Sequence, residues 1–142
     1  MRKKNTVMVV DAQGGGLGRQ LITSIRKELP DVRIIAVGTN SAATANMLKA
    51  GADEAATGEN AIRVVGRMVD FIIGPIGMVI ADAMLGEITP GIAIAVAQAE
   101  ARRIMIPFSN CDNYIAGVTD FSMSRLIEDA IRQLKKLLTD PV

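Results

Sequence analysis

The chain has 142 residues, of which 49% are hydrophobic and 22% are charged, so we expect a single folded domain over residues 1–142. Its 16 basic and 15 acidic residues give a net charge of +1, which argues against a surface for nucleic acid or an anionic membrane. The most apolar stretch, Phe71–Ala81, is about half as long as the roughly 20 residues that span a bilayer. The single cysteine and the lack of an apolar leader favour a cytoplasmic location.

Apolar segments and segments of helical periodicity alternate along the chain. The predicted strands are Thr6–Asp11, Arg33–Gly38, Asp53–Thr57, Val69–Gly74 and Arg103–Pro107. The predicted helices run from Leu17 to Leu29, from Ser41 as N-cap to Ala50, over Glu59–Met68, from Thr89 and Pro90 to Ala101, and over Ser122–Leu138. This alternation predicts an α/β fold of Rossmann-like type, a three-layer, doubly wound, mostly parallel sheet of about five strands in the order 3-2-1-4-5. Tyr114–Val118 is an additional candidate edge strand, whose short link suits an antiparallel return.

A glycine-rich turn separates the first strand from the first helix. This is the place where a doubly wound sheet presents backbone amides and a helix N-terminus to a phosphate. We therefore predict that the turn binds a small phosphate-bearing molecule, the alternative being a turn that serves only tight helix packing. The predicted contacts are Asp11, Gln13, Gly14, Gly15, Gly16, Leu17 and Gly18. Asp11 has two interpretations, a ligand for a hydroxyl or cation and, favoured here, an acceptor for amides of its own turn.

The residues around the turn narrow the class of ligand. The second strand ends in Gly38, and no Asp or Glu follows it to bind a ribose 2′-hydroxyl, as NAD sites require. Thr39 and Asn40 are suited to a 2′-phosphate but lack an accompanying arginine, so NADP and NAD both stay open as cofactors. Arg19 and Gln20 stand where a P-loop has Lys and Ser or Thr, which argues against NTP hydrolysis.

Other strand ends meet the same edge of the predicted sheet. Candidate ligand contacts there are Thr57, Gly58, Glu59, Gly74, Pro75, Ile76 and Gly77. The first three are suited to an adenine or a ribose, or else to capping the next helix, and the other four to close ligand approach or to a rigid turn. Ser109–Asn113, which contains Cys111, is interpreted as a solvated connection rather than an active-site loop. No group of side chains predicts a metal site, and the chain has no histidine.

Four segments together carry a resemblance to a known family. They are Asp11–Gly18 (DAQGGGLG), Gly38–Thr44 (GTNSAAT), Met47–Ile62 (MLKAGADEAATGENAI) and, within Ile72–Pro90, IIGPIG and MLGEITP. With these motifs the chain resembles a bacterial domain-of-unknown-function family of small Rossmann-like proteins, which implies the fold and the pocket loops but no reaction. The turn and VDFIIGPIG are also distantly similar to short-chain dehydrogenases. That family uses a Tyr and a Lys four residues later, and here Tyr114 is followed by Val118.

Three functions fit these observations. The first is binding of a nucleotide or dinucleotide of NAD(P) type, and the second is a non-enzymatic sensor or partner-binding module that uses the same pocket. The third is an NAD(P)-dependent oxidoreductase of unknown substrate, whose cofactor would carry the chemistry. We also expect a homodimer, because the apolar residues of Met78–Ala99 are hard to bury in so small a chain.

Overall fold

A parallel five-stranded sheet organises the protein, whose computed structural model describes residues 5–107, 113–119 and 122–140. Its order β3-β2-β1-β4-β5 confirms the predicted doubly wound arrangement. The strands are β1 Thr6–Asp11, β2 Arg33–Gly38, β3 Glu54–Thr57, β4 Phe71–Pro75 and β5 Arg102–Ile106. The chain winds outward from β1 to β3 and then continues on the other side of β1 with β4. The carboxyl ends of β1 and β4 therefore form the switch point, where such sheets bind ligands.

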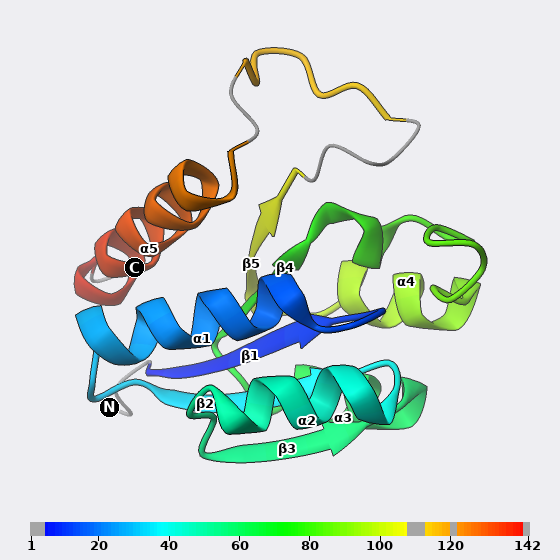
Figure 1. Cartoon of the computed structure of the whole chain (residues 1–142), viewed down its shortest axis with the longest axis horizontal. Helices are drawn as coiled ribbons and strands as arrows, with labels where there is room; N and C mark the ends of the chain where they lie inside the picture. Colours follow the sequence, from blue (N-terminus) through cyan, green and yellow to red (C-terminus); the bar gives the residue numbers. More distant parts are fainter. Residues whose placement is uncertain (1–4, 108–112, 120–121, 141–142) are drawn as a thin grey trace.

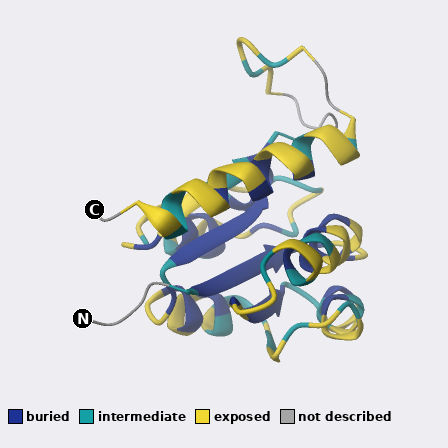
Figure 2. Cartoon of the chain, turned by 90° about the vertical axis from the view of Figure 1, so that its left-hand side faces the viewer, coloured by how far each residue is buried: buried dark blue, intermediate teal, exposed yellow. Residues whose placement is uncertain are grey.

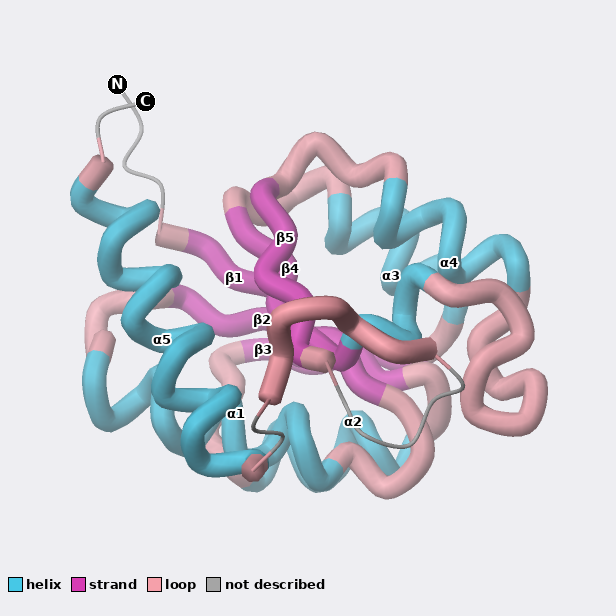
Figure 3. The backbone as a smooth tube through the Cα atoms, turned by 90° about the horizontal axis from the view of Figure 1, so that it is seen from above, coloured by secondary structure: helices cyan, strands magenta, loops and turns pink. Residues whose placement is uncertain are grey.

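Helices cover both faces of the sheet (Figures 1 and 3). They are α1 Gly16–Glu28, α2 Ser41–Lys49, α3 Glu59–Gly66, the 3₁₀ helix η1 Ile76–Val79, α4 Pro90–Ala97 and α5 Met123–Thr139. Helices α1, α2 and α5 pack on one face, and α3 and α4 pack on the other. Figure 1 shows α5 lying along α1, so the C-terminal helix returns to the face where the first helix lies.

Two hydrophobic cores separate the sheet from these helix layers (Figure 2). Val7–Val10 of β1 are fully buried, with alternate side chains in the two cores, which explains why the central strand is continuously apolar in sequence. Helix α5 is amphipathic, and it buries Ile127, Ala130, Ile131 and Leu134. Among the described residues, no helix is both long and apolar enough to cross a membrane.

Three local predictions were wrong. Tyr114–Val118 is not a strand, because Gly117 adopts a φ of 89° in a turn, Tyr114 is 85% exposed, and none of the described strands pairs with the segment. The N-cap of α2 is Asn40 rather than Ser41, since the Asn40 Oδ1 accepts from the amide of Ala43 at 2.9 Å.

Helix α4 is the third correction, because it ends at Ala97 instead of continuing to Ala101. The amide of Arg102 donates to the carbonyl of Asp70 at 3.0 Å, so the chain must already be extended at that residue to begin β5. The ends of β3, β4 and β5 differ slightly from the predicted ones for the same reason, since strand pairing and not composition fixes where a strand begins.

Candidate functional site

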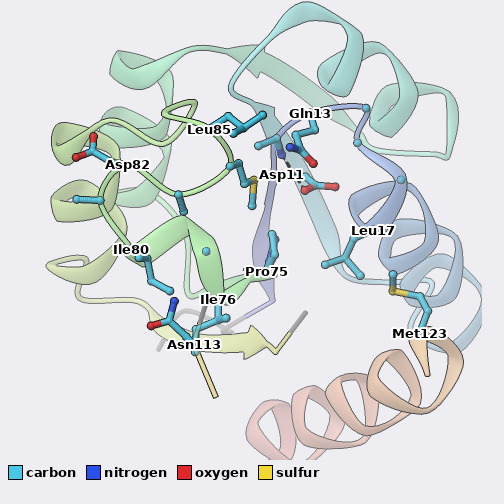
Figure 4. Close-up of a pocket in the computed structure, with 18 of the residues that line it drawn as sticks. Asp11, Gln13, Leu17, Pro75, Ile76, Ile80, Asp82, Leu85, Asn113 and Met123 are labelled. Atoms are coloured by element: carbon cyan, nitrogen blue, oxygen red, sulfur yellow. Dashed lines mark hydrogen bonds between the residues drawn. The ribbon is translucent and has the colours of Figure 1, made fainter. Parts of the chain in front are cut away.

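A cavity of about 750 Å³ lies at the switch point between the carboxyl ends of β1 and β4. Its size falls within the range of about 300–1,000 Å³ that is typical of small-molecule sites. One wall is the glycine-rich turn with Leu17, and the other is the chain from Pro75 to Leu85. Figure 4 shows Ile80 and Asp82 on one side of the cavity and Leu17 and Met123 on the other. The cavity thus lies where the sheet topology predicts a ligand.

The glycine-rich turn is shaped by close contact with α2. Gly15 has a φ of 74°, and a Cβ on it would lie 2.8 Å from the backbone Cα and O atoms of Ala43. Its amide donates to the carbonyl of Ala12 at 3.0 Å, which closes the turn. The Asn46 side chain donates to the carbonyl of Gly14 at 2.6 Å and ties α2 to the turn. Only glycine fits at position 15 without moving α2.

Three residues of the turn that line the cavity have backbone amides with no acceptor among the described residues. The N–H groups of Gly14, Gly16 and Leu17 donate to no residue that the structure describes, whereas that of Gly18 donates to Asp11 and that of Arg19 to Gly15. Gly16 and Leu17 belong to the first turn of α1, where the helix dipole places positive potential. Amides in this arrangement form an anion-binding site.

Asp11 is buried beneath the turn, with 5% of its surface exposed. Its two carboxylate oxygens accept from the amides of Ala12 at 2.8 Å and Gly18 at 2.7 Å. Burial raises the pKa of Asp11; the two amide bonds counteract this effect, and the charge of Glu87 adds to it. The interpretation that Asp11 binds its own turn is confirmed, and its carboxylate orients the first turn of α1.

The β4 side of the cavity supplies apolar surface. Pro75, Ile76 and Gly77 line it, as predicted from the sequence. Gly74 lies beneath them and is buried. A Cβ at this position would overlap the carbonyl oxygen of Val10 in the neighbouring strand. Gly74 therefore permits close approach of two strands instead of contacting the cavity.

Several predicted contacts lie away from the cavity lining. Thr57 pairs with the hydroxyl of Thr44 at 2.8 Å. Glu59 binds Arg63 at 3.2 Å and accepts from the hydroxyl of Thr89, which joins the N-termini of α3 and α4. Gly58 is the N-cap of α3, as the capping alternative expects, and no described side chain adds a hydrogen bond to this cap.

Three other predicted contacts also lie outside the lining, namely Gly18, Thr39 and Asn40. Gly18 is buried against Met47, where a Cβ would have no room. Thr39 and Asn40 both donate to the carboxylate of Glu87. An acidic side chain thus does lie at the end of β2, although it comes from a distant part of the sequence.

Sequence reasoning missed much of the second wall. It did not select Ile80–Leu85, Asn113 or Met123, which all line the cavity, nor Glu87 at its edge. The available signal was the position of Ile80–Leu85 a few residues after the predicted strand end at Gly74 and the loop Gly74–Gly77 that follows it. Of the predicted loop Ser109–Asn113, only Asn113 is among the described residues, so Cys111 lies outside them.

Comparison with known proteins identifies the family. The profile of the family described as Domain of unknown function (DUF3842) matches residues 6–139. The chain belongs to this family. Within DUF3842, residues 6–139 include the glycine-rich turn, Glu87 and both walls of the cavity. No curated protein matches the chain.

Two solved structures are similar in fold to this DUF3842 protein. One is a dodecameric FMN-dependent UbiX-like decarboxylase from Escherichia coli O157:H7, with a TM-score of 0.46 and 16% identity over 93% of this chain and 75% of that one. The other is the D-arabinose dehydrogenase from Sulfolobus solfataricus, with a TM-score of 0.46 and 14% identity over 99% of this chain. The match covers 46% of the dehydrogenase, so this chain spans less than half of its length.

Proposed function

We propose that the protein binds a dinucleotide of NAD(P) type, with its phosphates on the amides of Gly14, Gly16 and Leu17. The observation that carries this proposal is the set of three N–H groups that line a cavity of about 750 Å³ and donate to no described residue. The apolar wall from Pro75 to Leu85 suits a flat ring, which would lie opposite the phosphates.

The charges of the cavity favour a dinucleotide over a nucleotide with a terminal phosphate. Among the described lining residues, the charged side chains are Asp11 and Asp82, and no Lys or Arg joins them. A terminal phosphate carries a charge of about −1.5 to −2 near neutral pH and is usually held by a cation as well as amides. The two phosphates that link the halves of a dinucleotide form a pyrophosphate with a single charge on each phosphate, which amides and a helix dipole can hold.

A thermal-shift and calorimetric screen tests the proposal with NAD, NADP, ATP, FMN and coenzyme A. A ligand at 100 times its Kd stabilises the folded state by about 2.7 kcal/mol, which raises the Tm by several degrees in a chain of this size. We expect that shift with NAD or NADP. Failure of both NAD and NADP to raise the Tm would refute the proposed function.

Gly16→Val tests where the ligand binds. A Cβ on Gly16 meets no atom within 4 Å and Gly16 lines the cavity, so the added side chain occupies ligand space without disturbing the fold. Ala42→Val is a matched control, because it adds a branched side chain to the exposed first turn of α2, outside the cavity. We expect Gly16→Val alone to lose the ligand-induced shift. Equal shifts in both variants would place the ligand elsewhere.

The described residues support binding rather than an oxidoreductase reaction. Hydride transfer to or from a carbonyl needs a group that moves a proton at the substrate. The titratable side chains in the described lining are Asp11, whose oxygens already accept two amides, and Asp82. A sensor or partner-binding module is therefore the second candidate. Ligand-dependent assembly without cofactor turnover would distinguish it from an enzyme.

We also propose that the protein forms a homodimer. Within Met78–Ala99 the buried apolar side chains are Met78, Ile88, Ile92, Ala93 and Val96, whereas Leu85 is fully exposed and Ile94 is 53% exposed. These two side chains supply apolar surface on the segment that was expected to pair. Sedimentation at micromolar concentration tests this, and a monomer under those conditions would refute it.

A further inference from the structure

Glu87 lies between the ends of β1 and β2, although it follows β4 in the sequence. One oxygen of its carboxylate, Oε2, accepts from the amide of Gln13 at 2.7 Å, from the side chain of Asn40 at 2.9 Å and from the hydroxyl of Thr39. Gln13 lines the cavity, whereas Thr39 and Asn40 do not. The Glu87 carboxylate therefore lies where the cavity meets the end of β2.

The segment that carries Glu87 is held in one conformation. Its residues Asp82, Met84 and Leu85 have φ values of 66°, 58° and 57°, which residues other than glycine adopt only when their surroundings enforce them. The amide of Asp82 donates to the carbonyl of Ile88 at 2.7 Å, and the Ile88 side chain is fully buried. An anchored, internally bonded segment thus positions the carboxylate.

The second carboxylate oxygen of Glu87 is available to a ligand. No described residue donates to Oε1, and the residue is only half-buried. Burial acts to raise the pKa of Glu87, but the three hydrogen bonds to Oε2 outweigh it and hold the pKa below its ordinary value. The side chain is therefore a charged acceptor at neutral pH.

We propose that Glu87 binds the hydroxyls of the adenosine ribose through Oε1 and selects NAD over NADP. This inference rests on the proposed function. In doubly wound dinucleotide sites, an acidic residue at the end of the second strand accepts from the ribose 2′-hydroxyl. Here the end of β2 offers Thr39 and Asn40, and Glu87 supplies the carboxylate at that place from another segment. Its charge repels a 2′-phosphate, and it occupies the two side-chain donors that would otherwise hold one.

Calorimetric titration with NAD and NADP tests the assignment in wild type, Glu87→Gln and the control Glu54→Gln. Glu54 is an exposed acid that pairs with Arg33 and lies at the amino end of β3, away from the cavity. We expect wild type and Glu54→Gln to bind NAD at least about tenfold more tightly than NADP. The NADP complex loses a hydrogen bond to the charged Glu87 and gains a repulsion between Glu87 and the 2′-phosphate. Glu87→Gln should bring the two affinities close together.

A second titration uses the wild type alone, so it remains decisive if Glu87→Gln does not fold. It compares NAD with the analogue that lacks the 2′-hydroxyl of the adenosine ribose, which we expect to bind about tenfold more weakly. Equal binding of the two would overturn the role of Glu87. An unchanged preference of Glu87→Gln for NAD would also overturn the role of Glu87. So would an equal gain in affinity for NAD and NADP, because Glu87 would then only obstruct binding of either cofactor. If wild type binds neither cofactor, the proposed function itself fails.

Discussion

Replacement of Asp11 by Asn tests how the chain's own carboxylate organises the glycine-rich turn. The carboxylate uses one oxygen for the amide of Ala12 at 2.8 Å and the other for the amide of Gly18 at 2.7 Å. An asparagine side chain has one acceptor oxygen and one NH₂ donor. In Asp11→Asn, one of these two amides must therefore face a donor at a position that is 5% exposed.

A buried backbone donor that loses its acceptor costs about 1–3 kcal/mol. Removal of a buried charge offsets part of this loss, so we expect the free energy of unfolding at pH 7 to fall by about 1–2 kcal/mol. Denaturant titration followed by circular dichroism measures this change, with an unchanged slope as the check on the transition. A variant as stable as wild type would refute the claim that both amide bonds stabilise the turn.

The pH dependence of this difference has a defined sign. The pKa of Asp11 is raised in the folded state, so the folded protein binds the proton more tightly than the unfolded chain. This contribution to stability is complete below the ordinary pKa of about 3.9 and is lost as the pH rises through the raised value. The free energy of unfolding of wild type should therefore exceed that of Asp11→Asn by a larger amount at pH 4 than at pH 7.

Asp53 supplies a control of opposite sign. Burial acts to raise its pKa, but the amide of Ile34, at 2.8 Å, and the Arg26 guanidinium outweigh that effect and lower it. Its contribution is present above the ordinary pKa and is lost as the pH falls through the lowered value. The loss in Asp53→Asn should be larger at pH 7 than at low pH. The same pH trend in Asp11→Asn and Asp53→Asn would refute the claim that the pKa values of Asp11 and Asp53 shift in opposite directions.

Three further substitutions test the packing around the site by thermal and denaturant unfolding. Gly15→Ala should destabilise by about 1–2 kcal/mol or more, because it places a Cβ in a left-handed conformation and against the backbone of Ala43; an unchanged Tm would contradict this. Gly74→Ala should cost about 1–3 kcal/mol, because its Cβ overlaps the carbonyl of Val10 inside the sheet; a neutral effect would mean that β4 moves freely. Thr89→Ala should cost about 1 kcal/mol, because it removes the N-cap of α4, and Thr89→Ser should restore most of it.

The central part of the fold was predictable because strands that are buried on both faces consist almost entirely of apolar residues. Strands β1, β2 and β4 are enclosed on both faces, so their sequences are continuous apolar runs. The edge strand β3 has only the residues Glu54–Thr57 and was a weaker prediction, since it is half-exposed. Tyr114–Val118 failed for the opposite reason, because apolar residues in a short segment do not specify a strand unless a neighbouring strand pairs with them.

The candidate site was predictable to the extent that it is local. The turn between β1 and α1 is continuous in sequence, so its glycines indicate where amides are exposed. Thr57, Gly58 and Glu59 were placed by the same rule of strand ends, yet Glu59 binds Thr89 instead. What fixes their partners is the packing of α3 against α4, and that contact has no local signal.

Glu87 shows why the ligand class could not be read from the end of β2 alone. A search along the sequence finds no acid after Gly38, but the fold brings a carboxylate there from the segment that follows η1. The glutamate is separated from Thr39 by two strands, two α-helices and the 3₁₀ helix η1, and its place depends on the left-handed residues Met84 and Leu85. Local motifs therefore indicate the amides of the turn, whereas a carboxylate that comes from a distant segment leaves no local signal.

Two acidic residues, Asp11 and Glu87, bind three backbone amides of the turn. Asp11 takes the amides of Ala12 and Gly18, and Glu87 takes the amide of Gln13. The amide of Gly15 donates to the carbonyl of Ala12, and the amides of Gly14, Gly16 and Leu17, whose residues line the cavity, donate to no described residue. Gly14 and Gly16 are exposed, and the first amides of a helix have no acceptor within the helix, so these donors can bind water or a ligand. The proposed phosphate site thus consists of the amides that the two carboxylates and the Ala12 carbonyl leave without an acceptor among the described residues.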